Sequence, residues 1–218
     1  MSKPSIENIT CPQCGSGQEF TIWQSVNVTL DPELKEQLLR GQLTAFTCSR
    51  CGHTSDVAYS LLYHDMTRKF MVMLSYDDGP PEPELGPMAG IMSKMMSDMR
   101  LRMVRSRNEL VEKILLFDAE LDDRVIEVCK LVVSAQLKSA GETVRGIFFS
   151  GLDETEGDQK QLGFVVLSGE EQKGLGLAWS TYEHMATELA PRLRDLDKQE
   201  RPWLCVDSRY AGALVSSS

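Results

Sequence analysis

Cys11-Pro12-Gln13-Cys14-Gly15 and Cys48-Ser49-Arg50-Cys51-Gly52 are the two segments that decide the fold of the first part of this 218-residue chain. Each segment holds two thiols in one tight turn, and the glycine that follows relieves crowding where the backbone folds around a metal. Two such turns supply the four soft ligands of a tetrahedral zinc ion and leave no open position. The spacing therefore predicts a structural Zn(2+) site with four ligands, Cys11, Cys14, Cys48 and Cys51, and iron as the chemical alternative.

The residues between the two turns, 15–47, form a gap longer than the about 15–20 residues that are usual in such ribbons. The aromatic and β-branched segment 19–30 favours a strand. Asp31 and Pro32 favour the start of a short helix, and Gly41 favours its end. Residues 42–47 favour a second strand. An insertion of strand, helix and strand accounts for the long gap and places both turns at strand ends.

After the second turn, the sequence predicts a hairpin of strands 57–63 and 69–76. Residues 77–90 contain four prolines and three glycines, a composition typical of a linker or an extended surface segment. From Ile91 to Leu121, apolar side chains recur at steps of three and four, which predicts one long helix rich in methionine. A second, mostly buried helix is expected from about Asp123 to Lys138.

The last part of the chain is predicted to be rich in strands. Segments 145–150, 162–168 and 175–180 favour strands, and the turn 169–174 joins the last two as a hairpin. Ser180 and Glu183 fit a capping box, so a helix is expected from about Thr181, with Pro191 kinking or ending it. Residues 203–206 favour a final strand.

Beyond these patterns, the sequence resembles the CpXC domain family of bacteria and archaea. The resemblance lies in Cys11-Pro12-Gln13-Cys14-Gly15 and in several later motifs. These are Ser25-Val26-Asn27, Asp31-Pro32-Glu33-Leu34, Leu38-Leu39, Phe46-Thr47-Cys48, Cys51-Gly52, Leu62-Tyr63-His64-Asp65, Asn108-Glu109-Leu110-Val111-Glu112-Lys113-Ile114 and Leu121-Asp122-Asp123. Ser49 departs from the family, which often repeats proline in the second turn. The resemblance implies zinc binding, covers about residues 9–140 and implies no particular biochemical role.

Together these observations predict an α+β protein of two domains. Residues 9–140 form a CpXC-like zinc-binding domain, with a ribbon and hairpin over 9–76, the proline-rich linker over 77–90 and a helical part over 91–140. Residues 141–218 form a smaller, β-rich C-terminal α+β domain.

The overall charge limits the function classes. The net charge is −9 and no long segment is basic overall, so non-specific nucleic-acid binding is disfavoured. No apolar stretch is long enough to cross a membrane, and the N-terminal residues lack the apolar core of a secretory signal. We therefore expect a cytoplasmic protein, in which paired cysteines are metal ligands rather than disulfides.

The remaining candidate residues favour structural roles. His53, directly after the second turn, is expected to support a ligand or simply to be exposed rather than to bind the metal, and His64 is expected to stabilise a turn. Nothing in the sequence marks His184 as catalytic. Cys129 and Cys205 are expected to be buried thiols. If residues 91–121 are helical, Arg100, Arg102, Arg105 and Arg107 form two pairs on opposite sides and no single basic face.

The sequence therefore predicts a non-enzymatic, zinc-stabilised scaffold that acts through a protein partner or self-association. The closed site, the absence of a visible catalytic constellation and the adaptable methionine-rich segment favour this hypothesis. A nucleic-acid-binding ribbon is the alternative, if Lys35, Arg40, Arg50, Arg68 and Lys69 cluster in space. A third possibility is an enzyme with its site in residues 141–218.

Overall fold

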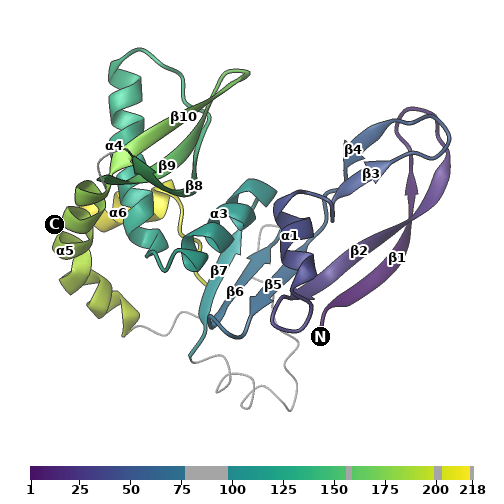
Figure 1. The fold of residues 1–218 in the computed structure, drawn as a ribbon, viewed down its shortest axis with the longest axis horizontal. Coiled ribbons are helices and arrows are strands. Elements are labelled where there is room, and N and C mark those ends of the chain that lie inside the picture. The colour runs from purple at the N-terminus through teal and green to yellow at the C-terminus, as the bar shows by residue number, and fades with distance from the viewer. Residues whose placement is uncertain (77–97, 156–158, 199–202, 217–218) are drawn as a thin grey trace. The chain divides into compact units, whose positions relative to one another are not determined.

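The computed structural model describes residues 1–76, 98–155, 159–198 and 203–216 (Figure 1). The chain divides into two compact units, residues 1–111 (unit 1) and 112–218 (unit 2), so the division falls inside one helix. The fold is α+β, as the sequence predicted. Among the described residues, no helix is both long and apolar enough to cross a bilayer.

Unit 1 is built on a five-stranded sheet with the order β1-β2-β5-β6-β7. Its strands are β1 (Lys3–Thr10), β2 (Gly17–Asn27), β5 (Leu61–Asp65), β6 (Phe70–Leu74) and β7 (Arg100–Val104). Neighbouring strands are antiparallel except for the β2–β5 and β6–β7 pairs, which are parallel. Val26, Tyr63 and Val72 stand in register across β2, β5 and β6 and are fully buried, which places the core of unit 1 on this face.

Two smaller parts complete unit 1. Helix α1 (Glu33–Leu39) buries Leu34 and Leu38, and the left-handed conformation of Gly41 follows its end, as the sequence predicted. Strands β3 (Ala45–Thr47) and β4 (Thr54–Asp56) form a separate antiparallel hairpin. Asp31 is not the helix cap that we expected, because its carboxylate accepts a hydrogen bond from the Ser2 backbone amide.

The predicted helix over residues 91–121 is wrong in its middle. Strand β7 occupies Arg100–Val104, and helix α3 (Arg107–Asp118) begins only after it. Residues 101–104 are all buried, so both faces of β7 lie against protein and the strand lacks the alternation by which strands are recognised. The methionines from 92 to 96 and the linker 77–90 lie outside the described residues.

Unit 2 combines helices with a three-stranded antiparallel sheet of order β10-β9-β8. After α3 come α4 (Asp123–Ser139), β8 (Gly146–Thr155), β9 (Gln159–Ser168), β10 (Glu171–Ala178), α5 (Trp179–Asp197) and α6 (Ser208–Ser216). Ile147, Phe149, Leu162, Phe164 and Val166 form the buried face of the sheet. Helix α4 confirms the expected second helix, and Asp122 caps it by accepting from the Arg124 amide.

Three details at the C-terminal end differ from the sequence predictions. No side chain caps α5, so the expected capping box of Ser180 and Glu183 is absent, and α5 continues through Pro191. Residues 203–206 do not form the expected strand, and α6, which the sequence analysis missed, follows them. The division into residues 9–140 and 141–218 stays a prediction, because it follows family resemblance whereas the two units follow spatial contacts.

Candidate metal centre

The four cysteines lie at the tips of two hairpins. Cys11 and Cys14 occupy the turn between β1 and β2, and Cys48 and Cys51 occupy the turn between β3 and β4. The structure brings these turns together, so that the four sulfur atoms all lie within 4.8 Å of one another. This is the arrangement that the spacing of the cysteines predicted.

The two turns have the same backbone structure. In the first, the Gly15 amide donates to the Cys11 carbonyl at 2.9 Å, and in the second the Gly52 amide donates to the Cys48 carbonyl at 2.9 Å. Both glycines are left-handed, with φ of 69° and 72°, a conformation that costs glycine little. The repeated geometry explains why each cysteine pair needs its glycine: it closes the turn and directs both thiols to one point.

The sulfur positions fit a tetrahedral metal ion. Cys11 Sγ lies 3.7 Å from Cys51 Sγ, and Cys14 Sγ lies 3.6 Å from Cys48 Sγ. Four thiolates that each bind one zinc ion at about 2.3 Å stand about 3.8 Å apart. All six cysteines of the chain are free of disulfide bonds. The cluster can therefore hold one metal ion, with all four coordination positions taken by sulfur.

A small apolar cluster supports the site. Cys11, Cys48 and Phe46 of β3 are buried, and Ile9, Phe20 and Val57 pack against them. The rings of Phe20 and Phe46 meet edge to face with centroids 6.1 Å apart. The three buried residues of this cluster make a small core, and a metal ion bound by the cysteines would add to its stability.

Gln18 of β2 joins the two hairpins, and sequence reasoning did not identify it. Its side-chain amide donates to the Thr47 carbonyl at 3.0 Å and accepts from the Ser49 amide at 2.8 Å and the Ser49 hydroxyl at 3.1 Å. These bonds tie the second cysteine turn to the strand that follows the first. A glutamine in a strand has no sequence signal for such a role, since its partners are 29 and 31 residues away.

The surroundings of Cys48 and Cys51 shift the pKa values of these two thiols in opposite directions. The Cys51 amide is the main donor to Cys48, and together with the Arg50 amide it lowers the pKa of Cys48 to about 6. The His53 amide acts in the same direction on Cys51, but desolvation and its contacts with the other three thiols raise the pKa of Cys51 to about 12. Thiols this close resist joint ionisation unless a cation neutralises them, which is what a bound divalent metal does.

The other predicted residues do not join the cluster. His53 contributes its backbone, since its carbonyl accepts from the Cys48 amide, and the group that could hold a metal ion contains cysteines alone. His64 lies in β5 rather than in a turn, and burial lowers its pKa. Cys129 is buried, as expected, and burial raises its pKa to about 11. Cys205 is exposed, so its predicted burial was wrong.

The family comparison agrees with the site. The family model of the CpXC proteins matches residues 9–130, which is more than half of the chain and includes all four cysteines. The chain therefore belongs to the CpXC family. No curated protein and no solved structure matches it.

Proposed function

We propose that the four-cysteine cluster binds one structural zinc ion, and that the protein is a non-enzymatic scaffold that recognises another protein or a second copy of its own chain. The observation that carries this proposal is the closed site. Four sulfurs from two matching turns fill a tetrahedron, which leaves no position for a substrate or an activated water. A metal held in this way stabilises the hairpin tips and takes no part in chemistry.

Zinc is the metal that we propose, with iron as its competitor. Both ions accept four thiolates in a tetrahedron, so the donor set alone does not choose between them. Elemental analysis of protein purified without added metal decides the question, and we expect close to one zinc per chain. A Cys48→Ser variant should lose the metal, whereas Cys205→Ser should keep it. One iron per chain, with the absorption of an iron–thiolate centre, would contradict the zinc assignment.

Exposed apolar side chains in unit 1 support a binding role. Leu30 is 60% exposed and Met66 is 46% exposed. Their two loops touch, because the Met66 amide donates to the Thr29 hydroxyl at 2.8 Å. Leu30 follows the end of β2, whereas the metal turns precede its start, and eleven strand residues span about 35 Å. The metal site therefore stabilises one end of the sheet and leaves this apolar pair at the other.

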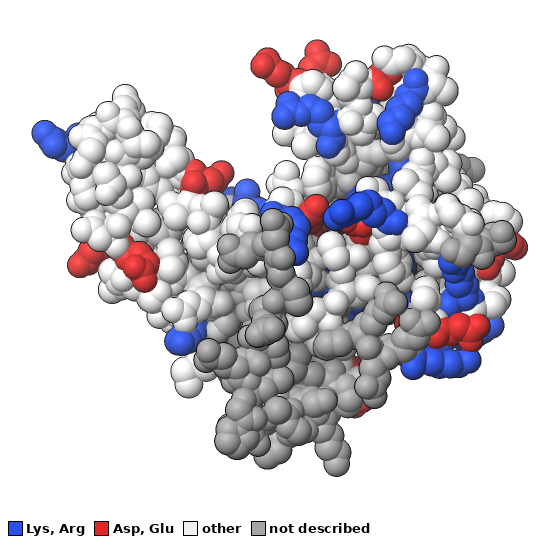
Figure 2. Space-filling model, turned by 180° about the vertical axis from the view of Figure 1, so that it is seen from behind, with Lys and Arg blue, Asp and Glu red and all other residues white. Residues whose placement is uncertain are grey.

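The nucleic-acid alternative has little support from the positions of the basic residues. Arg50 lies in the second cysteine turn, and Lys69 lies beside the β5–β6 turn, near the opposite end of β2. Arg40 and Arg68 have carboxylate partners in Glu36 and Asp65. On the face drawn in Figure 2, basic and acidic side chains are interspersed rather than gathered by sign. A salt titration with a nucleic acid tests this reading, and steep weakening of binding with salt would favour it.

The enzyme alternative would need accessible ionisable groups in unit 2. The carboxylates and the lysine that cluster there are buried: Glu112, Lys113, Asp123 and Glu127 are each 0–4% exposed. Groups that water and substrate do not reach are better suited to holding helices together than to catalysis. This burial supports the non-enzymatic reading.

Size-exclusion chromatography with light scattering tests the binding role. We expect a mass above that of the 24.4 kDa chain, or a second protein that copurifies in stoichiometric amount. Leu30→Asp should abolish the association. Val215→Asp should not abolish it, because Val215 is an exposed apolar residue of unit 2 and does not belong to the exposed pair of Leu30 and Met66. A strict monomer with no copurifying protein would overturn the proposed scaffold role and leave the metal assignment intact.

A further inference from the structure

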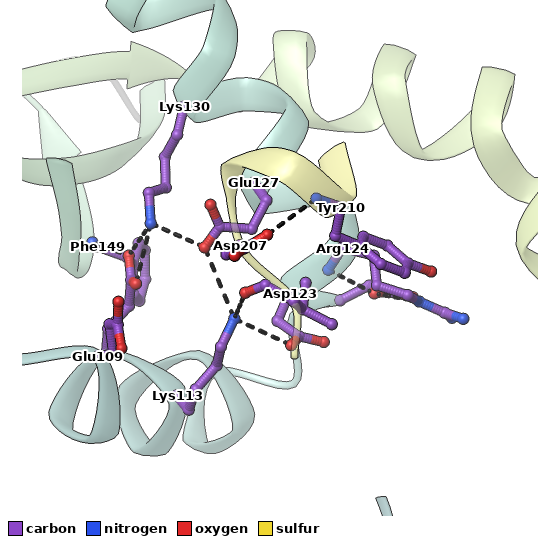
Figure 3. Close-up of polar contacts among 12 residues, drawn as sticks. Glu109, Lys113, Asp123, Arg124, Glu127, Lys130, Phe149, Asp207 and Tyr210 are labelled. Atoms are coloured by element: carbon purple, nitrogen blue, oxygen red, sulfur yellow. Dashed lines mark hydrogen bonds and ion pairs between the residues drawn. The ribbon is translucent and has the colours of Figure 1, made fainter. Parts of the chain in front are cut away.

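Four buried charged side chains and one half-buried lysine in unit 2 form a row in which the sign of the charge alternates (Figure 3). We call Glu112, Lys130, Glu127, Lys113 and Asp123, in this order, the charge row. Lys130 Nζ lies 3.0 Å from Glu112 Oε2 and 2.8 Å from Glu127 Oε1. Lys113 Nζ lies 3.7 Å from Glu127 Oε1 and 3.1 Å from Asp123 Oδ2. Glu127 is therefore the central carboxylate, shared by both lysines.

Backbone groups hold the row at two places, and a helix start favours one of its carboxylates. The Phe149 amide of β8 donates to Glu112 Oε1 at 2.7 Å. Lys113 Nζ donates to the carbonyl of Val206, in the segment that precedes α6, at 3.0 Å. Asp123 lies in the first turn of α4, where the helix dipole favours a negative charge. The row thus connects α3, α4, β8 and the C-terminal segment.

The charges of the row do not cancel. Three carboxylates face two ammonium groups, so the row holds one excess negative charge when every group is ionised. A buried net charge is costly, and a group in that position is neutralised by a proton where it can be. If Glu127 takes the proton, Glu112 keeps Lys130 and Asp123 keeps Lys113. The row then consists of two neutral ion pairs on either side of an uncharged carboxylic acid.

We propose that the charge row is a proton-linked switch: Glu127 takes up one proton as the pH falls, and the loss of the excess charge tightens the packing of α3, α4 and the C-terminal segment. Both states keep each remaining ion in contact with a partner. The same side-chain positions therefore serve both states, and the proton changes the strength of the packing rather than its pattern.

The electrostatics of the surrounding groups agree with this choice of residue. Burial raises the pKa of Glu127, Lys130 and Lys113 oppose the rise, and Glu112 adds to it. Burial by itself would lower the pKa of Lys130, but Glu112 and Glu127 outweigh it and raise that pKa, so Lys130 stays charged over the same range.

Charged groups on the neighbouring elements have partners of their own. Asp207, ahead of α6, accepts from the amides of Arg209 and Tyr210, and Asp197 of α5 pairs with Arg124. From β8, the contacts to the row are the Phe149 amide and the Phe148 ring, whose centroid lies 5.8 Å from Lys130 Nζ. Glu127 thus has the two lysines as its cationic partners, and the excess negative charge of the row is what favours its protonation.

The direction of the pH effect follows from the raised pKa. Between the folded pKa of Glu127 and the ordinary glutamate value of about 4.3, the folded state binds more protons than the unfolded state. Unit 2 therefore becomes more stable as the pH falls through this window, and the effect is absent above the folded pKa. One proton changes the opening equilibrium by at most about tenfold per pH unit.

Amide hydrogen exchange of α4 in the full-length, metal-loaded protein tests the proposal. After correction for intrinsic exchange rates, protection of α4 should increase as the pH falls, by up to about tenfold per unit. Glu127→Gln should remove this dependence and should show strong protection already at neutral pH, because glutamine resembles the protonated acid. Glu188→Gln, an exposed change on α5, should keep the wild-type dependence. An unchanged pH dependence in Glu127→Gln would overturn the proposal.

A second measurement needs no variant. The carboxyl carbon of Glu127 in isotope-labelled wild-type protein should titrate above the ordinary glutamate pKa, and the α4 amide shifts should follow the same transition. If the carboxyl titrates at or below the ordinary value, the proposed switch is wrong, whether or not Glu127→Gln folds. Because both readouts come from unit 2, proton competition for the cysteines of unit 1 does not obscure them.

Discussion

The metal centre of unit 1 and the charge row of unit 2 both gather charged groups, but they neutralise them differently. The small cluster at the cysteines has three buried residues, Cys11, Cys48 and Phe46, and the charge of four thiolates can be balanced by a cation from solution. In unit 2 the chain supplies both signs, and Lys113 and Lys130 balance most of the charge on three carboxylates. The hairpin tips should therefore depend on metal supply, whereas the interior of unit 2 should depend on pH.

The largest expected effect is the loss of a metal ligand. Cys48→Ser should release the metal, because three thiolates and a hydroxyl bind zinc far less tightly, and structural zinc contributes about 10 kcal/mol or more to small sites. Hydrogen exchange should show β3 and β4 becoming unprotected while α4 keeps its protection. Cys205→Ser serves as the control. Retained metal and protected β3 amides in Cys48→Ser would contradict the proposed role of the site.

The next effect concerns the charge row. Lys113→Met should destabilise unit 2 by about 3–5 kcal/mol, because it leaves buried Asp123 and Glu127 without a shared cation and Val206 without its donor. Urea unfolding followed by the fluorescence of Trp179 and Trp203 measures the change.

An exposed ion pair provides the matched control for Lys113→Met. Lys198 pairs with Asp195 at 2.7 Å, but both side chains are about three-quarters exposed, so Lys198→Met should cost about 0–1 kcal/mol. Equal losses of unfolding free energy in the two variants would show that burial of the charge row contributes little to the stability of unit 2.

A smaller effect is expected at Gln18, whose hydrogen bonds join the two cysteine hairpins. Gln18→Ala removes three hydrogen bonds to the second cysteine turn and should lower stability by about 1–2 kcal/mol. Faster transfer of the metal to a chromogenic chelator would report the loosened turn. Gln24→Ala is the comparison, since Gln24 is an exposed glutamine of the same strand, and it should transfer metal at the wild-type rate. Equal rates of metal transfer in the two variants would show that the Gln18 hydrogen bonds do not hold the second cysteine turn.

The smallest expected effect is a difference in reactivity among the cysteines, and measuring it requires no substitution. In metal-loaded protein near pH 8, a thiol reagent should modify exposed Cys205 readily and buried Cys129, whose pKa is raised to about 11, at least about 100-fold more slowly. Addition of a strong chelator should make four further thiols reactive. Immediate modification of five thiols before chelation would argue against metal binding by the cluster.

Sequence patterns identified the features that depend on neighbouring residues. Two Cys-x-x-Cys-Gly turns, the apolar period of α4 with Asp122 at its start, and Gly41 after α1 were all found correctly, because each is set by contacts within a few residues. The four cysteines that the structure brings together are those that the sequence proposed as ligands. Gln18 was missed, because hydrogen bonds to residues far along the chain have no local pattern.

The sequence by itself determined which four cysteines form the cluster, the α+β class and the family, since turn geometry and helical periodicity are local properties. Tertiary structure decided that residues 100–104 form a strand, because pairing with β6 and burial on both faces outweigh a helical period. It also decided that Glu112, Lys113 and Glu127 are interior residues. A charged side chain gives the same sequence signal on a surface as in a core, and only the partners that folding brings to it make its burial favourable.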